Sequence, residues 1–275
     1  MEEPLKLIEL NYLDRFRQHL MADDSPESVE RHLRWYLEFF GGLNIRFGYD
    51  RPIVRARICA DSSGFSHISE LFCPPPEITN VGRMNDKGNP MFYAAYHIGT
   101  AIAEINAKEG DIVQVAQFQL PETSERGLRC LIIGEIYNAY HGTSTFSQSL
   151  FDEIRKLIER LGKKNIRALL SYLYMDALSS ELLNDVSASK KDYIYSRTLS
   201  RLLLEKHPDI DGLIFPSAKI KGTSNIVLRP GAVLHKAKVV SSHIFRISKL
   251  YPYGLCDFEL IKEAKGEGID GRIIW

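Results

Sequence analysis

The chain has 275 residues, of which 44% are hydrophobic and 25% are charged, and these are ordinary values for a soluble globular protein. Its formal net charge is zero, so no overall charge directs it toward nucleic acid or an anionic membrane. We therefore expect no direct nucleic-acid partner. No run reaches the ~18 apolar residues of a membrane-spanning helix, so we also expect no membrane span.

The cysteines and the N-terminus indicate the cellular compartment. Cys59, Cys73, Cys130 and Cys256 form no C-x-x-C pair, which predicts free thiols rather than a zinc site or a disulfide framework. The histidines also show no metal-like spacing, so no metal is expected. Residues 1–16 are acidic where a signal peptide is basic, and we therefore expect a soluble, cytoplasmic protein.

Two amphipathic helices are predicted at the N-terminus, over residues 4–22 and from Pro26 to about residue 40. We assign residues 1–48 to a helical extension that precedes a main domain at 49–275. Two such helices cannot bury both faces, so we expect them to dock on the main domain or on a partner chain. The aromatic residues at 35–36 and 39–40 prompt the hypothesis of a homo-oligomer contact or a partner-facing surface.

The first strand is predicted at 53–58, where alternation places Arg55 and Arg57 on the same face. Two interpretations are open. The strand is an edge strand with both charges in water, or the pair is an anion site, because guanidinium groups bind phosphate oxygens with directed donors. The loop 59–80 that follows is long, which is typical of functional or mobile segments.

A turn-rich segment, a short apolar strand and a helix start follow within residues 80–104. The turn carries Arg83 and Asn85, the strand carries Tyr93, and the helix reaches Glu104. A cation, an amide and a carboxylate on a loop braced by regular elements predict a binding site. These residues alone do not identify the ligand.

The rest of the chain mixes helices and strands without a regular β-α alternation, which favours an α+β fold over a doubly wound sheet. Lys190 and Lys191 are interpreted as a solvated cap region. Helices are predicted at 147–160, 164–184 and 192–206, and strands at 111–120, 130–136, 212–217, 225–228, 233–240 and 255–261.

An ordered set of motifs resembles the RES domain, a family named for an arginine, a glutamate and a serine. The set spans residues 50–230 and consists of Arg55-x-Arg57, Gly82-Arg83-x-Asn85-x-x-Gly88-x-Pro90-x-x-Tyr93, Thr100-Ala101-x-x-Glu104, and Asp211-Gly212-x-x-x-Pro216-Ser217 followed by Asn225. One block alone is weak evidence, whereas the agreement of all blocks in order is strong.

The resemblance implies an ADP-ribosyltransferase-like fold, with a bent, split β-core around a cleft for NAD, flanking helices and the N-terminal helical extension. It also implies a toxin of a toxin–antitoxin system that cleaves the nicotinamide–ribose bond of NAD. If water is the acceptor, such an enzyme is an NAD glycohydrolase, which is a hydrolase. If inorganic phosphate is the acceptor, it is a phosphorylase, which is a transferase. A protein antitoxin would then cover the active site.

The resemblance also assigns roles to residues. Arg55, Glu104 and Ser217 are the predicted catalytic residues. Glu104 would stabilise positive charge on the ribose, Arg55 would hold the pyrophosphate, and Ser217 would donate a hydrogen bond to the ribose or the nicotinamide amide. The predicted NAD-binding residues are Arg83, Tyr93, Arg57, Asn85 and Asn225. Arg57 could instead be a supporting ion-pair residue, and Asn85 and Asn225 could brace loops.

Two other functions remain open. A mono-ADP-ribosyltransferase acting on a macromolecule often carries Glu or Gln two residues before its catalytic glutamate, but Ile102 stands there in this chain. A catalytically silent binding module is the third interpretation, with the N-terminal helices as its functional part. Turnover of NAD, with or without labelled protein, distinguishes the three.

Overall fold

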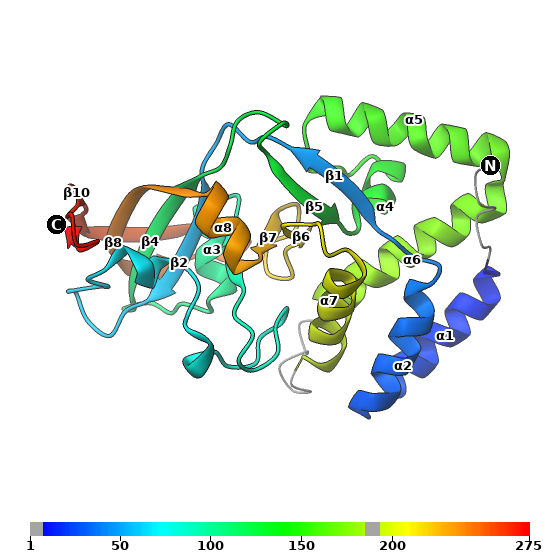
Figure 1. Ribbon diagram of the computed structural model, residues 1–275, viewed down its shortest axis with the longest axis horizontal. Coiled ribbons are helices and arrows are strands. Elements are labelled where there is room, and N and C mark those ends of the chain that lie inside the picture. Colours follow the sequence, from blue (N-terminus) through cyan, green and yellow to red (C-terminus); the bar gives the residue numbers. More distant parts are fainter. Residues whose placement is uncertain (1–7, 185–192) are drawn as a thin grey trace. The chain divides into compact units, whose positions relative to one another are not determined.

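The computed structural model describes residues 8–184 and 193–275, which fall into two compact units (Figure 1). The helical unit contains residues 8–44, Val81–Asn85, 131–184 and 193–209. The sheet unit contains residues Ile45–Asn80, Asp86–Cys130 and Ile210–Trp275. The predicted start of the first helix at residue 4 and the cap region at Lys190 and Lys191 lie outside the described residues.

Six helices within the described ranges build the helical unit. They are α1 (Leu10–Ala22), α2 (Pro26–Leu37), α4 (Glu135–Tyr140), α5 (Gln148–Lys164), α6 (Ile166–Asn184) and α7 (Ile194–Lys206). Helix α2 begins as predicted, because Pro26 takes the first turn and the Ser25 side chain accepts a hydrogen bond from the Ser28 amide at 3.3 Å. Across residues 8–184 and 193–275, no helix has the length and apolar character needed to cross a membrane.

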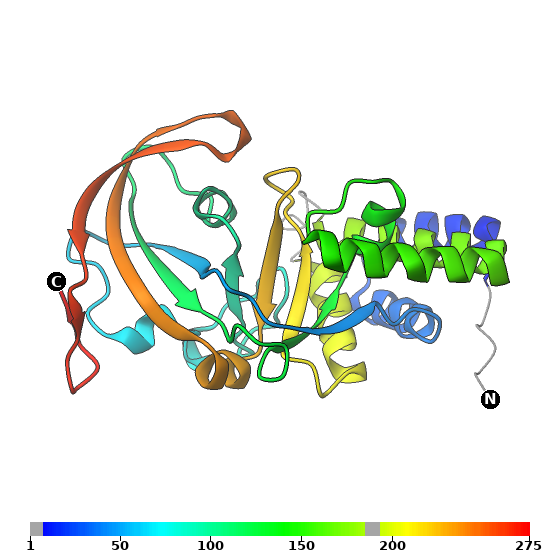
Figure 2. The same ribbon diagram turned by 90° about the horizontal axis from the view of Figure 1, so that it is seen from above.

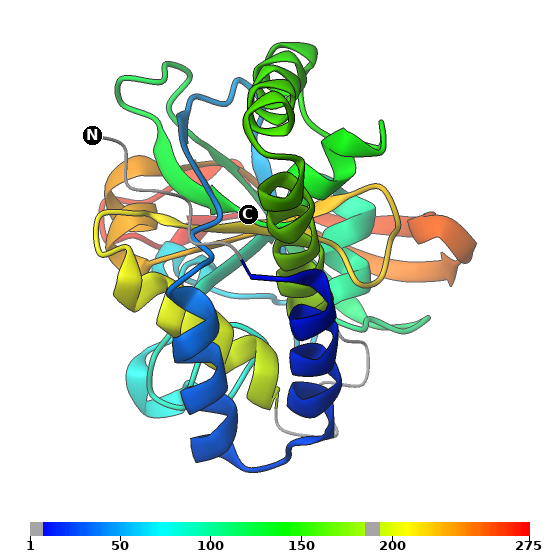
Figure 3. The same ribbon diagram turned by 90° about the vertical axis from the view of Figure 1, so that its right-hand side faces the viewer.

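The two N-terminal helices pack inside the helical unit, α1 against α6 and α2 against α7 (Figure 3). Phe16 of α1 stacks on Tyr36 of α2, with ring centroids 5.6 Å apart. The Tyr36 hydroxyl lies 2.8 Å from the Ser179 hydroxyl on α6, and Tyr36 and Phe40 are fully buried. Much of the aromatic run that prompted the partner-surface hypothesis therefore lies in the core of this unit.

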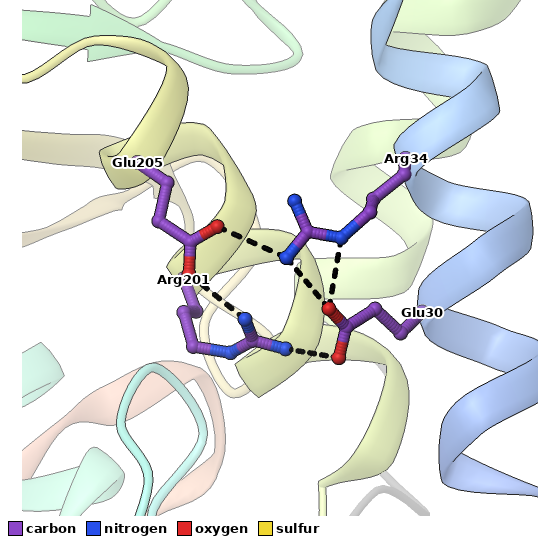
Figure 4. Close-up of polar contacts among 4 residues, drawn as sticks. All are labelled: Glu30, Arg34, Arg201 and Glu205. Atoms are coloured by element: carbon purple, nitrogen blue, oxygen red, sulfur yellow. Dashed lines mark hydrogen bonds and ion pairs between the residues drawn. The ribbon is translucent and has the colours of Figure 1, made fainter.

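Charged side chains join α2 to α7 at the surface (Figure 4). Arg201 of α7 donates to Glu30 at 2.7 Å and to Glu205 at 2.8 Å. Arg34 of α2 donates to Glu30 at 2.6 Å and to Glu205 at 3.2 Å. The C-terminus of α2 has a further partner in Lys206, which donates to the carbonyl oxygens of Leu37 and Phe40, the latter at 2.9 Å.

A nine-stranded sheet, in the order β1-β5-β6-β7-β3-β2-β4-β8-β9, dominates the other unit. Its strands are β1 (Leu43–Phe47), β2 (Ile53–Ile58), β3 (Phe92–Ala95), β4 (Ile112–Gln119), β5 (Leu128–Ile132), β6 (Gly212–Pro216), β7 (Ser224–Leu228), β8 (Lys238–Leu250) and β9 (Cys256–Glu263). With the flanking helices, this establishes a mixed α+β architecture, as predicted.

The sheet is nearly divided between β2 and β3. These strands share a single pair of Cα partners, Val54 and Ala95, whereas β2 runs alongside β4 over its whole length. Helix α3 (Ile98–Glu104) lies inside the bend of the sheet (Figure 2). Its Ala101 and Ile102 pack in one cluster with Val54 and Ala95, so α3 covers the face of the sheet on which these strand residues lie.

The C-terminal strands bind back onto the sheet unit. The hairpin of β10 (Gly266–Glu267) and β11 (Ile273–Ile274) holds the long loop after β2. The Ile68 amide donates to the Gly271 carbonyl at 2.9 Å, and the Ile273 amide donates to the Ser66 carbonyl at 2.8 Å. The long loop is thus ordered and contains two short 3-10 helices, Ile68–Leu71 and Pro76–Ile78.

Two predicted strands differ from the structure. The strand predicted at 233–240 is wrong, because helix α8 (Pro230–Lys236) occupies its first half; Pro230 at the first helical position starts the helix. The strand predicted at 130–136 ends at Ile132 because Gly134, with φ +84°, turns the chain into α4. The Asp176 carboxylate accepts a hydrogen bond from the Gly134 amide at 2.8 Å, and this bond fixes the turn.

Candidate active site

Three of the predicted site residues form one hydrogen-bonded cluster at the C-terminal end of α3. The Ser217 hydroxyl donates to Glu104 Oε1 at 2.6 Å, and the Asn225 side-chain amide donates to the same oxygen at 2.7 Å. No bond to Glu104 Oε2 is found within the described residues. The cluster therefore fixes one carboxylate oxygen and leaves the other for a ligand.

The sheet register brings these residues together from distant parts of the sequence. Asn225 of β7 is the Cα partner of Ala95 on β3, and β6 pairs with β7 so that its end, just before Ser217, lies beside Ser224. Ala95 and Asn225 share a face because directly opposite residues of an antiparallel pair point to the same side. That face is the one covered by α3, which carries Glu104.

Ser217 is held by the turn that follows it. Its Oγ accepts the backbone amides of Lys219 and Ile220, both at 3.1 Å, and its own amide donates to the Thr223 carbonyl at 2.8 Å. A serine hydroxyl has one hydrogen to donate and two lone pairs to accept, so all three capacities are used. Ser217 thus acts as a fixed donor to Glu104 rather than as a free hydroxyl.

Arg55 lies at the seam between β2 and β3. Its Nη1 donates to the Tyr93 carbonyl at 2.8 Å, and its guanidinium carbon lies 5.1 Å from the centroid of the Phe92 ring. Strand alternation puts Arg55 and Phe92 on the face opposite to α3. Burial, with a smaller contribution from nearby Arg57, lowers the pKa of Arg55 to about 10, so the side chain remains charged at neutral pH.

Two buried polar atoms of this region are unsatisfied. Arg55 Nε and Asn225 Oδ1 have no hydrogen-bond partner among the described residues. Buried polar atoms without partners are rare, and they often mark places where a ligand binds. Arg55 lies at the seam on β2, on the face opposite to α3, whereas Asn225 lies on β7, beyond β3, on the face that α3 covers.

Arg57 is engaged by the loop 59–80. Its Nη1 donates to the Glu70 carbonyl, and its guanidinium carbon lies 4.1 Å from the centroid of the Phe65 ring. Burial lowers the pKa of Arg57 as well. These two contacts are with a backbone carbonyl and an aromatic ring, and both predicted roles of Arg57, in NAD binding and in an ion pair, stay predictions.

The turn residues Arg83 and Asn85 belong to the helical unit. Arg83 donates to the Leu183 carbonyl at 3.1 Å and lies 5.8 Å from the centroid of the Tyr193 ring. Asn85 is buried, and its backbone exchanges two hydrogen bonds with Gly82. Their predicted role in binding stays a prediction.

Tyr93 is half-buried on β3, two residues from Ala95, and it therefore faces the side of the sheet that α3 covers. Its predicted role in NAD binding stays a prediction. The four cysteines are free thiols, as predicted, and Cys59 and Cys130 are buried. No group of three or more potential metal ligands occurs in the part of the chain that the structure describes.

Three residues next to the cluster were not identified from the sequence: Gly99, Ile220 and Gly254. A Cβ on Gly99 would come within 2.1 Å of the Gly254 carbonyl oxygen, and a Cβ on Gly254 within 2.0 Å of Ile220 Cδ1. A glycine in the first turn of a helix is a signal of close backbone approach. The approaching partner, far along the chain, has no local signal.

Comparison with known proteins identifies a family for this chain. No curated protein matches the sequence. The family model described as the RES domain matches residues 53–248, which include all eight predicted site residues and most of the chain. The arginine at the seam and the glutamate–serine pair lie within that match, and the chain belongs to the RES domain family.

Proposed function

We propose that this protein degrades NAD by cleaving its nicotinamide–ribose bond and that its sheet unit is an ADP-ribosyltransferase-like core. The observation that carries the proposal is the geometry at Glu104. One carboxylate oxygen is fixed by Ser217 and Asn225, and the other has no partner among the described residues. A carboxylate held in this way is ready to face developing positive charge.

The reaction needs a positioned negative charge more than a nucleophile. When the bond between C1′ and the pyridinium nitrogen breaks, its electron pair goes to nicotinamide and the ribose ring becomes positive. Glu104 would stabilise that charge, as carboxylates do for oxocarbenium-like transition states. Water or inorganic phosphate then adds to C1′, and with water a proton is released. Ser217 is a positioning residue here, because its hydrogen is donated to Glu104.

The remaining predicted residues would bind the dinucleotide. Tyr93 would form a wall of the nicotinamide pocket, and Arg55 would offer its unsatisfied Nε to a pyrophosphate oxygen at the seam. Asn225 is proposed as the brace of Glu104, and the roles predicted for Arg83 and Asn85 in NAD binding stay predictions. In this proposal residues 49–275 form the catalytic domain, and a protein antitoxin covers it.

The test is NAD consumption by the purified chain, with and without phosphate, followed by identification of the products. We expect nicotinamide together with ADP-ribose or its phosphorylated form. Glu104→Gln should lower the rate on the order of 10²-fold or more, because it removes the charge and keeps an acceptor for Ser217. Glu122→Gln, an exposed carboxylate of the same unit, is the control.

Other outcomes separate the alternatives. Labelled protein bands after incubation with labelled NAD would replace the proposal with protein ADP-ribosylation. A folded wild-type chain that leaves NAD intact in both buffers would contradict any NAD-cleaving function and favour a binding module.

A further inference from the structure

The hairpin between β8 and β9 places its tip against the start of α3 and the turn that follows Ser217, and this tip lies beyond the family match at 53–248. The Tyr251 amide donates to the Leu255 carbonyl at 2.9 Å, and the Tyr251 hydroxyl donates to Asp257 at 2.8 Å. Tyr253 and Gly254 both have left-handed backbone conformations, with φ of +67° and +75°. The tip is therefore a defined turn.

Gly254 is enclosed by two other segments of the sheet unit. A Cβ on Gly99, in the first turn of α3, would collide with the backbone carbonyl of Gly254. The Cα of Gly254 faces the side chain of Ile220, in the turn after β6. Figure 2 shows the hairpin tip, α3 and the β6–β7 turn on the same side of this unit. Gly254 therefore packs backbone to backbone on Gly99 and against the side chain of Ile220.

Ile220 connects this contact to the candidate site. Its amide donates to Ser217 Oγ, and its carbonyl accepts the Thr223 hydroxyl at 2.8 Å. A shift that carries the Ile220 backbone with it would therefore disturb one of the two amide bonds that orient the Ser217 hydroxyl. That hydroxyl would then no longer be aimed at Glu104 Oε1.

We propose that the tip of the β8–β9 hairpin positions Ser217 for catalysis, through the contacts of Gly254 with Gly99 and Ile220. This inference rests on the function proposed above. The tip needs no contact with the substrate to act in this way. Disturbing it should therefore lower kcat and leave KM nearly unchanged.

The chain offers a matched pair of glycines for the test. Gly99 and Gly231 each occupy the second position of a seven-residue helix in the sheet unit, but a Cβ on Gly231 would meet nothing within 4 Å. Gly99→Ala should lower kcat tenfold or more with KM within twofold of wild type. Gly231→Ala should leave both constants unchanged.

A second readout does not depend on turnover. Hydrogen exchange of the Lys219 and Ile220 amides, followed by NMR, should accelerate in Gly99→Ala and not in Gly231→Ala, while the amides of β4 stay protected in both. If wild-type protein consumes no NAD, the proposed function fails. The exchange measurement still tests whether the contacts of Gly254 hold the turn that carries Ser217.

The inference is overturned if Gly99→Ala keeps wild-type kcat and wild-type exchange at these two amides. Should Gly99→Ala fail to fold, Ile220→Ala and Ile220→Leu decide the matter. Loss of kcat in the alanine variant with recovery in the leucine variant supports positioning, and equal, wild-type kcat in both contradicts it.

Discussion

Glu104 Oε1 accepts hydrogen bonds from the side chains of Ser217 and Asn225, and these two residues are not equally suitable for mutation. Ser217 cannot be changed without affecting its own turn, whereas Asn225 contributes a side-chain amide whose replacement leaves the backbone of β7 intact. Asn225 is therefore the residue at which the charge around Glu104 can be altered with the least structural disturbance.

Asn225→Asp should make NAD cleavage depend on pH in a new way. The added carboxylate lies beside Glu104, and two close carboxylates retain a shared proton to higher pH than either does alone. Relative to wild type, activity should thus be lost more severely at pH 6 than at pH 8. Asn225→Ser, which removes the donor without adding charge, should lose activity equally at both values, and equal loss in the aspartate variant would contradict this account.

Two buried carboxyl groups in the helical unit make its stability depend on pH. Burial raises the pKa of Glu135 to about 7 and that of Asp176 to about 6, although both groups accept hydrogen bonds, Glu135 from Ser144 and Asp176 from two backbone amides. Both bind protons more tightly in the folded chain than in the unfolded chain, where carboxyl groups titrate near 4. Their contribution is therefore greatest at low pH and is lost as pH rises through the folded pKa values.

Glu135→Gln should reduce this dependence. The difference in free energy of unfolding, variant minus wild type, should increase from pH 5 to pH 8, because the buried glutamine carries no charge at any pH. Urea unfolding at four pH values in this range measures the difference. A variant whose curve runs parallel to that of the wild type would show that Glu135 does not titrate in the folded protein.

At the scale of elements, the contacts between α2 and α7 are of two kinds, ion pairs at the surface and hydrogen bonds to backbone carbonyl oxygens. Arg34 belongs to the network of ion pairs in Figure 4, but more than half of its side chain is exposed. Lys206 is an exposed residue, but its ammonium group satisfies the carbonyl oxygens of two buried residues, Leu37 and Phe40, at the end of α2. Exposed ion pairs contribute little to stability, whereas buried polar groups left without partners are costly.

Lys206→Met should accordingly destabilise the chain by about 1–3 kcal/mol. Arg34→Met should cost less than about 1 kcal/mol, although Arg34 makes more ion pairs. Chemical denaturation of both variants at low and high salt tests the ranking, since only the Arg34 contribution should decline with salt. The reverse ranking would mean that the network, not the helix cap, holds α2 to α7.

Most elements could be predicted from local patterns. The N-cap at Ser25, the strand 53–58 and the strand that ends before Ser217 follow from turn residues and apolar periodicity. The errors at 233–240 and 130–136 arose where a short apolar run fits either a strand or a helix, and Pro230 and Gly134 decided between them.

The candidate site was predictable only as a set of residues. The motif order identified Glu104, Ser217 and Asn225, but their shared oxygen depends on the β3–β7 register, which no local pattern gives. The neighbouring motif residues Arg83 and Asn85 belong to a different compact unit from Glu104. Closeness along the sequence therefore did not indicate which residues share a unit.

At the scale of the whole molecule, the N-terminal helices complete the core of the helical unit. Leu33 of α2 is fully buried, and Leu10 of α1 is 39% exposed. Leu33→Ala should destabilise the chain by about 2–5 kcal/mol, because it leaves a cavity in a packed core. Leu10→Ala should cost less than about 1 kcal/mol, as surface changes usually do.

Thermal and urea unfolding measure both variants. If Leu33→Ala unfolds at the same midpoint as the wild type, α2 does not contribute to the cooperative core. The N-terminal helices would then be an appendage, and their role as an oligomer contact or antitoxin-facing surface would be the better explanation of their sequence.

The pairing of β3 with β7 has a consequence for synthesis. Glu104 leaves the ribosome more than one hundred residues before Ser217 and Asn225, the two donors that fix its carboxylate. Chains emerge from the N-terminus onward, so the cluster cannot assemble until β7 has been made. A nascent or prematurely terminated chain that stops before β7 therefore carries the glutamate without its partners, and the cell would meet the assembled site only in molecules that extend past β7.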